Sequence, residues 1–151
     1  MKQRLGLSMT ICTTEDCNLR CKYCYETDKK KKDISLDTAK KFLDLMIEKD
    51  PDPILSFDEK EGCRFTKDIY NRGVTLDFIG GDSLMNVDLL EDIVKYFIYK
   101  LHTSHSQNAL LWRDNWRLSL STNGTLFGDP KVRAFCEKYK RVLSLGVSID
   151  G

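Results

Sequence analysis

Three cysteines fall within eight residues of the chain, and thiols at such spacing are typical ligands of metal sites. Cys17, Cys21 and Cys24 follow the pattern C-x3-C-x2-C and lie among Asn, Arg and Lys. Buried structural cysteines would instead be expected on an apolar, periodic face. Because thiolates bind zinc and iron–sulfur clusters, the pattern indicates a metal site.

Several kinds of metal site fit this pattern to different degrees. A structural zinc site needs four ligands, so Cys12, Cys63, Cys136 or a histidine would have to supply the fourth. A closed ferredoxin-type cluster commonly shows C-x2-C-x2-C spacing with a fourth cysteine nearby, which fits less well. The remaining interpretation is an iron–sulfur cluster with three thiolates and one open iron, and an open position lets a metal bind and activate a substrate or cofactor.

The elements that must position this loop alternate between strand and helix. Short β-prone segments predict strands at residues 6–12, 74–79, 116–121 and 142–149. Apolar residues at helical spacing predict helices at 33–49, from 86 onward and from 129 onward, whereas 50–72 follow neither period and form an expected insertion. Ser35, Asn86 and Asp129 are the expected N-caps.

This order predicts an α/β fold with a parallel sheet joined by right-handed crossovers. Both doubly wound sheets and barrels satisfy it, and both collect their chemistry in the loops after the carboxyl ends of the strands. The second strand runs into Gly80, Gly81 and Asp82. A glycine pair lets the backbone approach a ligand closely, and a carboxylate can pair with an ammonium group.

The last two strands end in short polar segments. The third runs into Asn123-Gly124 and the fourth into Ser148-Ile149-Asp150-Gly151. Asn-Gly and Asp-Gly are also common turn formers, so either pair alone says little. We expect both at the same edge of the sheet as the cysteine loop.

Taken in order, these motifs resemble the radical S-adenosylmethionine (SAM) superfamily. The cysteine pattern, with Tyr23 before its last cysteine, resembles the cluster-binding signature of that superfamily. Gly80-Gly81-Asp82 is similar to its Gly-Gly-Glu segment, with Asp replacing Glu and Ser83 replacing a frequent Pro. The last two strand ends resemble the Thr-Asn-Gly and Ser-Ile-Asp-Gly segments of the peptide- and protein-modifying branch, which includes anaerobic sulfatase-maturating enzymes and ribosomal-peptide maturases.

The resemblance implies a fold, two cofactors and a reaction. The fold would be the parallel (βα)3β half of a partial (β/α)6 TIM-like barrel. A [4Fe-4S] cluster on the three cysteines would cleave SAM reductively, and the resulting radical would abstract hydrogen from a peptide or protein. The implied SAM-binding residues are Tyr23, Gly80, Gly81, Asp82, Asn123, Ser148 and Asp150. A flavodoxin or ferredoxin would supply the electron, and no catalytic side chain is implied.

The composition limits the classes of partner that the chain is expected to bind. The 151 residues carry a formal net charge of +1 and no long apolar run, which gives no reason to expect nucleic acid or a membrane. The N-terminus lacks a signal-peptide pattern, so we expect a cytoplasmic protein whose thiols stay reduced. The alternative to an enzyme is a non-enzymatic zinc or iron–sulfur redox module.

The length predicts an N-terminal portion of a longer enzyme, inactive by itself, without the second half of the barrel or any auxiliary-cluster domain. The fourth strand would then be an apolar edge able to self-associate. Other residues are expected to be structural. Cys12 and Cys136 are predicted in the core, Trp112 and Trp116 in packing contacts, and the histidines and residues 29–32 at the solvated surface.

Overall fold

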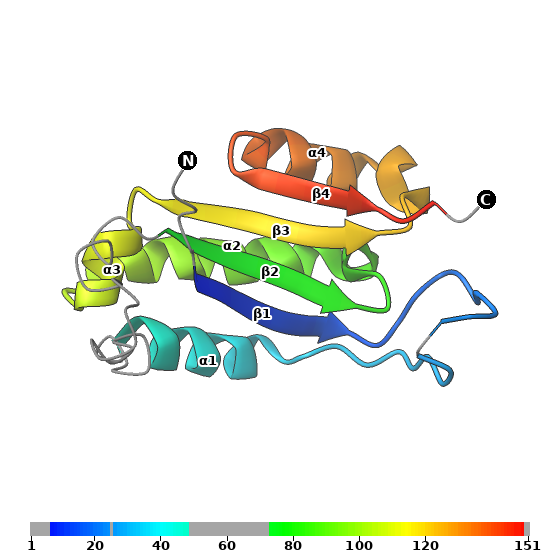
Figure 1. The fold of residues 1–151 in the computed structure, drawn as a ribbon, viewed down its shortest axis with the longest axis horizontal. Helices are drawn as coiled ribbons and strands as arrows, with labels where there is room; N and C mark the ends of the chain where they lie inside the picture. The colour runs from blue at the N-terminus through cyan, green and yellow to red at the C-terminus, as the bar shows by residue number, and fades with distance from the viewer. Residues whose placement is uncertain (1–6, 25, 49–72, 150–151) are drawn as a thin grey trace, which may run out of the picture.

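The computed structural model describes residues 7–24, 26–48 and 73–149, and its centre is a four-stranded parallel sheet in the order β1-β2-β3-β4 (Figure 1). The strands are β1 (Leu7–Thr14), β2 (Val74–Gly80), β3 (Trp116–Thr122) and β4 (Leu143–Val147). The helices are α1 (Leu36–Glu48), α2 (Val87–Thr103), α3 (Gln107–Trp112) and α4 (Pro130–Tyr139). Two 3-10 turns, η4 (Ser83–Asn86) and η5 (Thr125–Gly128), follow β2 and β3.

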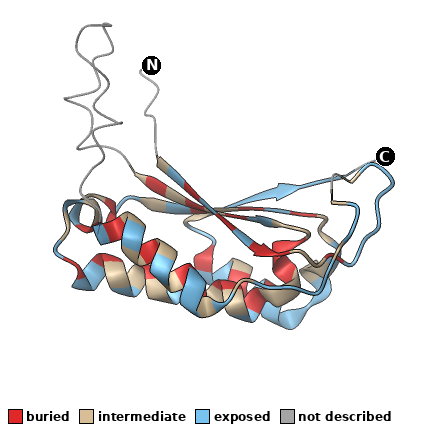
Figure 2. Cartoon of the chain, turned by 90° about the horizontal axis from the view of Figure 1, so that it is seen from below, coloured by how far each residue is buried: buried red, intermediate tan, exposed pale blue. Residues whose placement is uncertain are grey.

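In the part of the chain that the structure describes, the helices cover one face of the sheet, and no helix lies on the other, which we call the open face (Figure 2). A doubly wound sheet carries helices on both faces and reverses its strand order, so this arrangement is singly wound. Side chains alternate along β1: Met9 and Ile11 are buried against the helices, whereas Thr10 and Cys12 are exposed. The open face is mainly hydroxylic and carries Ser8, Thr10, Thr75, Asp77, Arg117, Ser119, Ser121 and Ser144.

The core lies between the sheet and the helices, and it explains why the predicted apolar spacings form helices. Leu43 and Ile47 of α1, and Phe97 of α2, are completely buried against the strands. Complete burial of such a side chain stabilises the fold by about 2 kcal/mol. Phe97 also packs against Trp116, with ring centroids 5.8 Å apart and nearly perpendicular planes. Trp112 is buried as well, which confirms the packing role predicted for both tryptophans.

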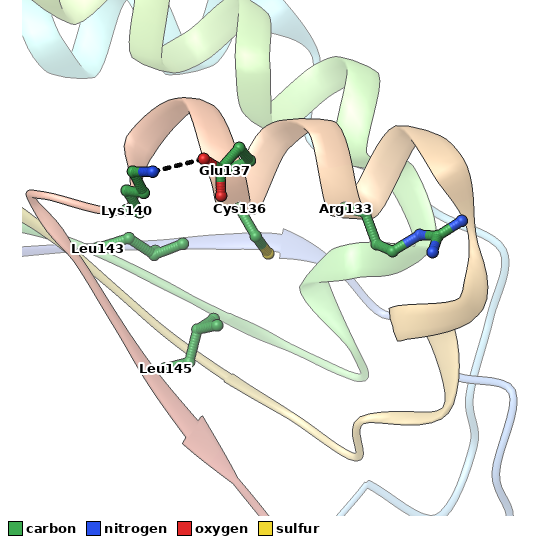
Figure 3. A pocket seen from close by; sticks show the side chains of 6 residues that line it. All are labelled: Arg133, Cys136, Glu137, Lys140, Leu143 and Leu145. Carbon is green, nitrogen blue, oxygen red and sulfur yellow. Dashed lines mark hydrogen bonds and ion pairs between the residues drawn. The ribbon is translucent and has the colours of Figure 1, made fainter.

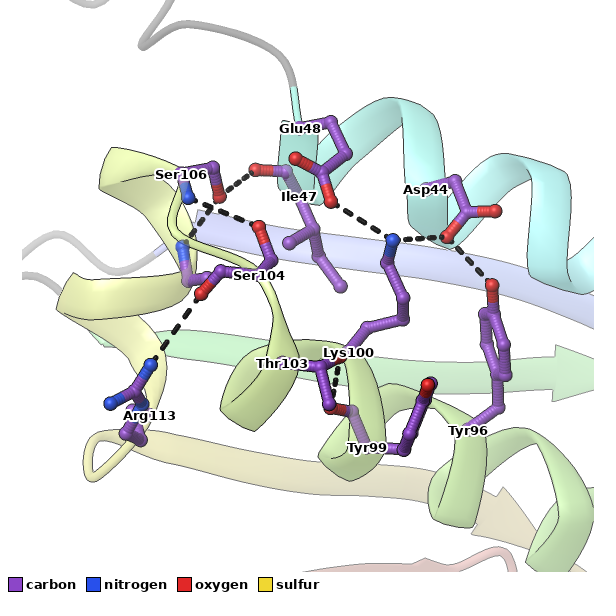
Figure 4. A network of polar contacts seen from close by, with 11 residues as sticks. Asp44, Ile47, Glu48, Tyr96, Tyr99, Lys100, Thr103, Ser104, Ser106 and Arg113 are labelled. Atoms are coloured by element: carbon purple, nitrogen blue, oxygen red, sulfur yellow. Dashed lines mark hydrogen bonds and ion pairs between the residues drawn. The ribbon is translucent and has the colours of Figure 1, made fainter.

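A polar network joins α1 to α2 (Figure 4). The Lys100 ammonium lies 3.2 Å from Asp44 and 2.9 Å from Glu48, and the Tyr96 hydroxyl donates to Asp44 at 2.8 Å. The hydrogen bond to Lys100 holds the pKa of Glu48 below its ordinary value. This network fixes the two helices beneath the first half of the sheet.

The predicted helix starts are confirmed. The Asn86 carboxamide accepts from Leu89 N–H, the Asp129 carboxylate accepts from Lys131 and Val132 N–H, and Ser35 Oγ accepts from Thr38 N–H. The helix α3 is not predicted by the sequence interpretation. The expected insertion at 50–72, including Cys63, lies outside the described residues.

The expected core position of Cys12 is wrong. Its backbone pairs with Ile79 in a register that turns both side chains to the open face, so the thiol is exposed. Partial desolvation by its neighbours, together with the nearby Glu26 and Glu15 carboxylates, raises the pKa of this thiol. Cys136 is half-buried beside β4 rather than enclosed.

Candidate functional site

The cysteine loop begins where β1 ends and returns to the sheet before α1. Its base is closed by an antiparallel bridge between Thr14 and Asp33, with Glu15 N–H donating to Lys32 O at 2.9 Å. None of the described cysteines forms a disulfide; within the loop Cys17 is buried, Cys24 is half-buried and Cys21 is exposed. The loop therefore presents thiols on a closed base at the carboxyl edge of the sheet.

The Cys17 sulfur is the most enclosed of the three and accepts two hydrogen bonds. Leu19 N–H donates to it at 3.4 Å, and the Asn123 Nδ2 amide donates from the end of β3 at 3.7 Å. The Cys17 N–H itself donates to Asp16 Oδ1 at 2.9 Å. Two polar donors are thus directed at one sulfur, the atom through which a cysteine binds metal.

Lys29 is a cation of this loop that interacts with the cysteine thiols. Burial alone lowers the pKa of its ammonium, but hydrogen bonding and charge interactions with Cys17 and Cys24 outweigh burial and raise it. Its Nζ also donates to Leu19 O at 3.0 Å. Of residues 29–32, Lys29 is half-buried, whereas Lys30, Lys31 and Lys32 are exposed as expected.

Gly80 and Gly81 hold the end of β2 against the cysteine loop. A Cβ at Gly80 would overlap Thr14 O, and one at Gly81 would overlap Asp16 O. The φ of Gly80 is +145°, which disfavours other residues. Gly81 N–H donates to Thr14 O at 2.9 Å, and Asp82 N–H donates to Asp16 O at 2.8 Å. Glycine is therefore required at these two positions because the end of β2 lies close to the backbone of Thr14 and Asp16.

The Asp82 carboxylate is 1% exposed and turned toward the end of β3. It accepts from Thr122 Oγ1 at 3.1 and 2.9 Å, from Asn123 N–H at 3.0 Å and from Leu84 N–H at 3.0 Å. We call this group of residues, Asp82, Leu84, Thr122 and Asn123, the strand-end latch. These contacts indicate that Asp82 ties β2 to β3. The predicted contact between Asp82 and the ammonium group of a cofactor stays a prediction.

The remaining predicted site residues differ in how closely they contact this edge of the sheet. Asn123 is in direct contact with the cysteine loop, as described above. Ser148 N–H donates to Thr122 O at 2.9 Å, which places Ser148 beside the latch with an exposed side chain. Tyr23 is also exposed. Asp150 lies outside the described residues.

Sequence reasoning missed four residues that build this edge. Asn18 Nδ2 donates to Thr125 Oγ1 at 2.7 Å, which joins the cysteine loop to η5. Thr122 and Lys29 complete the set. Thr122 stands next to Asn123 in the motif and so could have been found, but the Asn18–Thr125 contact spans 107 positions and leaves no local signal.

The donor set suits an iron–sulfur cluster. Among residues 7–24, 26–48 and 73–149, no three His, Cys, Asp or Glu side chains converge closely enough to hold a single metal ion. A cluster instead offers a separate iron to each thiolate, and the loop supplies three thiols together with polar donors around Cys17. These are the residues that would hold it.

One hollow of the molecular surface is separate from this edge. A hollow of about 530 Å³ lies between α4 and β4, and none of its lining residues belongs to the cysteine loop (Figure 3). Its walls are formed by Arg133, Cys136, Glu137, Lys140, Leu143 and Leu145.

In the part of the chain that the structure describes, no helix is both long and apolar enough to cross a membrane.

Comparison with known proteins supports the cluster interpretation. The chain is 29% identical over 139 residues to an uncharacterised protein of Methanocaldococcus jannaschii, covering 91% of this chain but 36% of that protein. The chain thus spans about a third of the length of this relative. Residues 5–115 match the family described as a 4Fe-4S single cluster domain. Since the match includes all three loop cysteines and most of the chain, the protein belongs to the 4Fe-4S single cluster domain family.

Proposed function

We propose that this chain is the cluster-binding part of a radical SAM enzyme that modifies a peptide or protein, within a TIM-like partial barrel. The observation that carries the proposal is the direct contact of three strand ends at one edge. Gly81 and Asp82 bond to the cysteine loop, and Asn123 bonds both to Asp82 and to Cys17. These contacts between the first three motifs support the proposal that they serve one site.

The singly wound sheet supports the barrel part of the proposal. Sequential parallel strands with helices on one face are the arrangement from which a β/α barrel is built. The hydroxyl-rich face of the sheet would then line the interior. Peptide modification is supported by the resemblance of the last two strand ends to that branch.

Each described residue has a defined task in this proposal. Cys17, Cys21 and Cys24 would hold a [4Fe-4S] cluster, which when bound supplies the electron for reductive cleavage of SAM to a hydrogen-abstracting radical. Lys29 balances negative charge at Cys17 and Cys24. Gly81 holds the start of the cysteine loop close to the end of β2, through its N–H bond to Thr14 O and its lack of a side chain. SAM would lie over the edge formed by the strand ends.

The test compares loop cysteines with cysteines elsewhere in the same chain. Each of Cys17, Cys21 and Cys24 is replaced by Ala, and Cys12→Ala and Cys136→Ala serve as matched controls. All variants are reconstituted anaerobically with iron and sulfide. We expect the loop variants to lose bound iron and the change that added SAM makes in the electron paramagnetic resonance signal of the reduced cluster, and the controls to keep both.

Two outcomes would contradict the proposal. Wild-type iron content and a wild-type response of the cluster signal to SAM in Cys21→Ala would show that the loop does not hold the cluster that binds SAM. Stoichiometric zinc without sulfide in the wild-type protein would instead favour a non-enzymatic metal module.

A further inference from the structure

We infer that Asn123 is a positioning residue that tunes the reduction potential of the cluster through its hydrogen bond to the Cys17 sulfur. The inference rests on the proposed ligation of the cluster by Cys17. It assigns to the Asn-Gly segment after β3 a task directed at the cluster, separate from the SAM contact that the resemblance implies for Asn123.

The direction of the Asn123 carboxamide is fixed by its own partners. Its Oδ1 accepts from Thr125 N–H at 2.9 Å and from Thr125 Oγ1 at 2.6 Å. An amide nitrogen in that position would face two donors, so the oxygen must lie there. The Nδ2 is left to donate to Asn18 Oδ1 at 2.9 Å and to Cys17 Sγ at 3.7 Å.

The backbone of Asn123 is held as firmly as its side chain. Its N–H donates to Asp82 Oδ2 at 3.0 Å, and the preceding Thr122 hydroxyl donates to the same carboxylate. Gly124 N–H donates to Thr122 Oγ1 at 3.1 Å, and its φ of +78° suits glycine. The strand-end latch therefore fixes the distance between the Asn123 amide and the loop.

The three thiols consequently have unequal surroundings. Cys17 is 5% exposed and receives side-chain and backbone donors, whereas Cys21 is exposed. A donor directed at a ligand sulfur stabilises the more negative, reduced cluster and raises its reduction potential. Removal of the Asn123 donor therefore makes the cluster harder to reduce.

The test is a potentiometric titration of the reconstituted protein, followed by the electron paramagnetic resonance signal of the reduced cluster. Asn123→Leu removes the donor with little change in volume. Asn123→Asp keeps the oxygen that faces Thr125 and replaces the Nδ2 donor with an acceptor. It is the second test variant, used if Asn123→Leu folds poorly. We expect the equilibrium between reduced and oxidised cluster to fall about tenfold, or about 59 mV for one electron.

The control is Asp129→Ala, which removes the cap of α4 from the same connection but no contact with a cysteine. We expect it to lower stability and leave the potential unchanged. An unchanged potential in both Asn123 variants, with iron lost in Cys17→Ala, overturns the inference alone. An equal shift in Asp129→Ala also overturns it, because the effect would then be general loosening. Wild-type iron in Cys17→Ala overturns the proposed ligation and the inference together.

Discussion

The strand-end latch makes a strong prediction about stability. Asp82→Ala removes one buried carboxylate and leaves three donors without their acceptor: Leu84 N–H, the Thr122 hydroxyl and Asn123 N–H. A buried donor left unsatisfied costs about 1–3 kcal/mol. Since Asn123 is only half-buried and water can enter the vacated space, we expect a total loss of about 3–5 kcal/mol.

The assay is urea unfolding followed by tryptophan fluorescence, with thermal unfolding as a second measure. At about 2–4 °C per kcal/mol for a chain of this size, the melting temperature should fall by about 10 °C. The matched control is Asp77→Ala, which removes a carboxylate from the same strand on the open face. Asp77 accepts one bond at 3.4 Å, from Thr10, so we expect a loss within about 0.5 kcal/mol.

A double-mutant cycle separates the latch from a general effect of the substitution. Thr122→Val removes the hydroxyl that donates to Asp82, and we expect the two substitutions to couple by about 1–3 kcal/mol. If Asp82→Ala costs no more than Asp77→Ala, or if Asp82 and Thr122 behave additively, the latch does not hold the two strands together.

Three further outcomes are expected from the same geometry. Gly80→Ala should destabilise the protein by more than about 2 kcal/mol in urea unfolding, because its Cβ overlaps Thr14 O at a positive φ. Gly128→Ala, where the added Cβ meets open space, should change stability by less than about 1 kcal/mol. Lys100→Met should cost about 1 kcal/mol at low salt and less at high salt, because the ion pairs of Lys100 are partly solvated. At pH 8 iodoacetamide should alkylate Cys12 more slowly than a free cysteine, because the raised pKa of Cys12 leaves less thiolate. Glu15→Gln should speed this alkylation, because it removes one of the negative charges that raise the pKa of Cys12.

The elements that the sequence predicts well are those specified by nearby residues. The Asp129-Pro130 start of α4 is confirmed because both the cap and the proline act within one turn. The parallel order of the strands is confirmed because helices of this length leave few other connections.

The parts that the sequence does not predict depend on contacts between distant residues. The side of the sheet that Cys12 faces is set by the register of β1 on β2, which a short apolar run does not specify. Lys29 donates to Leu19 O of the cysteine loop, while Lys30 and Lys32 of the same run pair with Asp28 and Glu15. Residue type alone does not distinguish these lysines.

The departure at position 82 from the Gly-Gly-Glu pattern is understandable only in the folded chain. The short Asp82 side chain caps the turn that follows it by accepting from Leu84 N–H, and it also reaches Thr122 and Asn123 on the next strand. A longer carboxylate would have to displace β3 or leave the cap, because the site is closed on all sides. Thus Asp82 and Thr122 fit each other, and the latch that they form keeps Asn123 at the sulfur of Cys17.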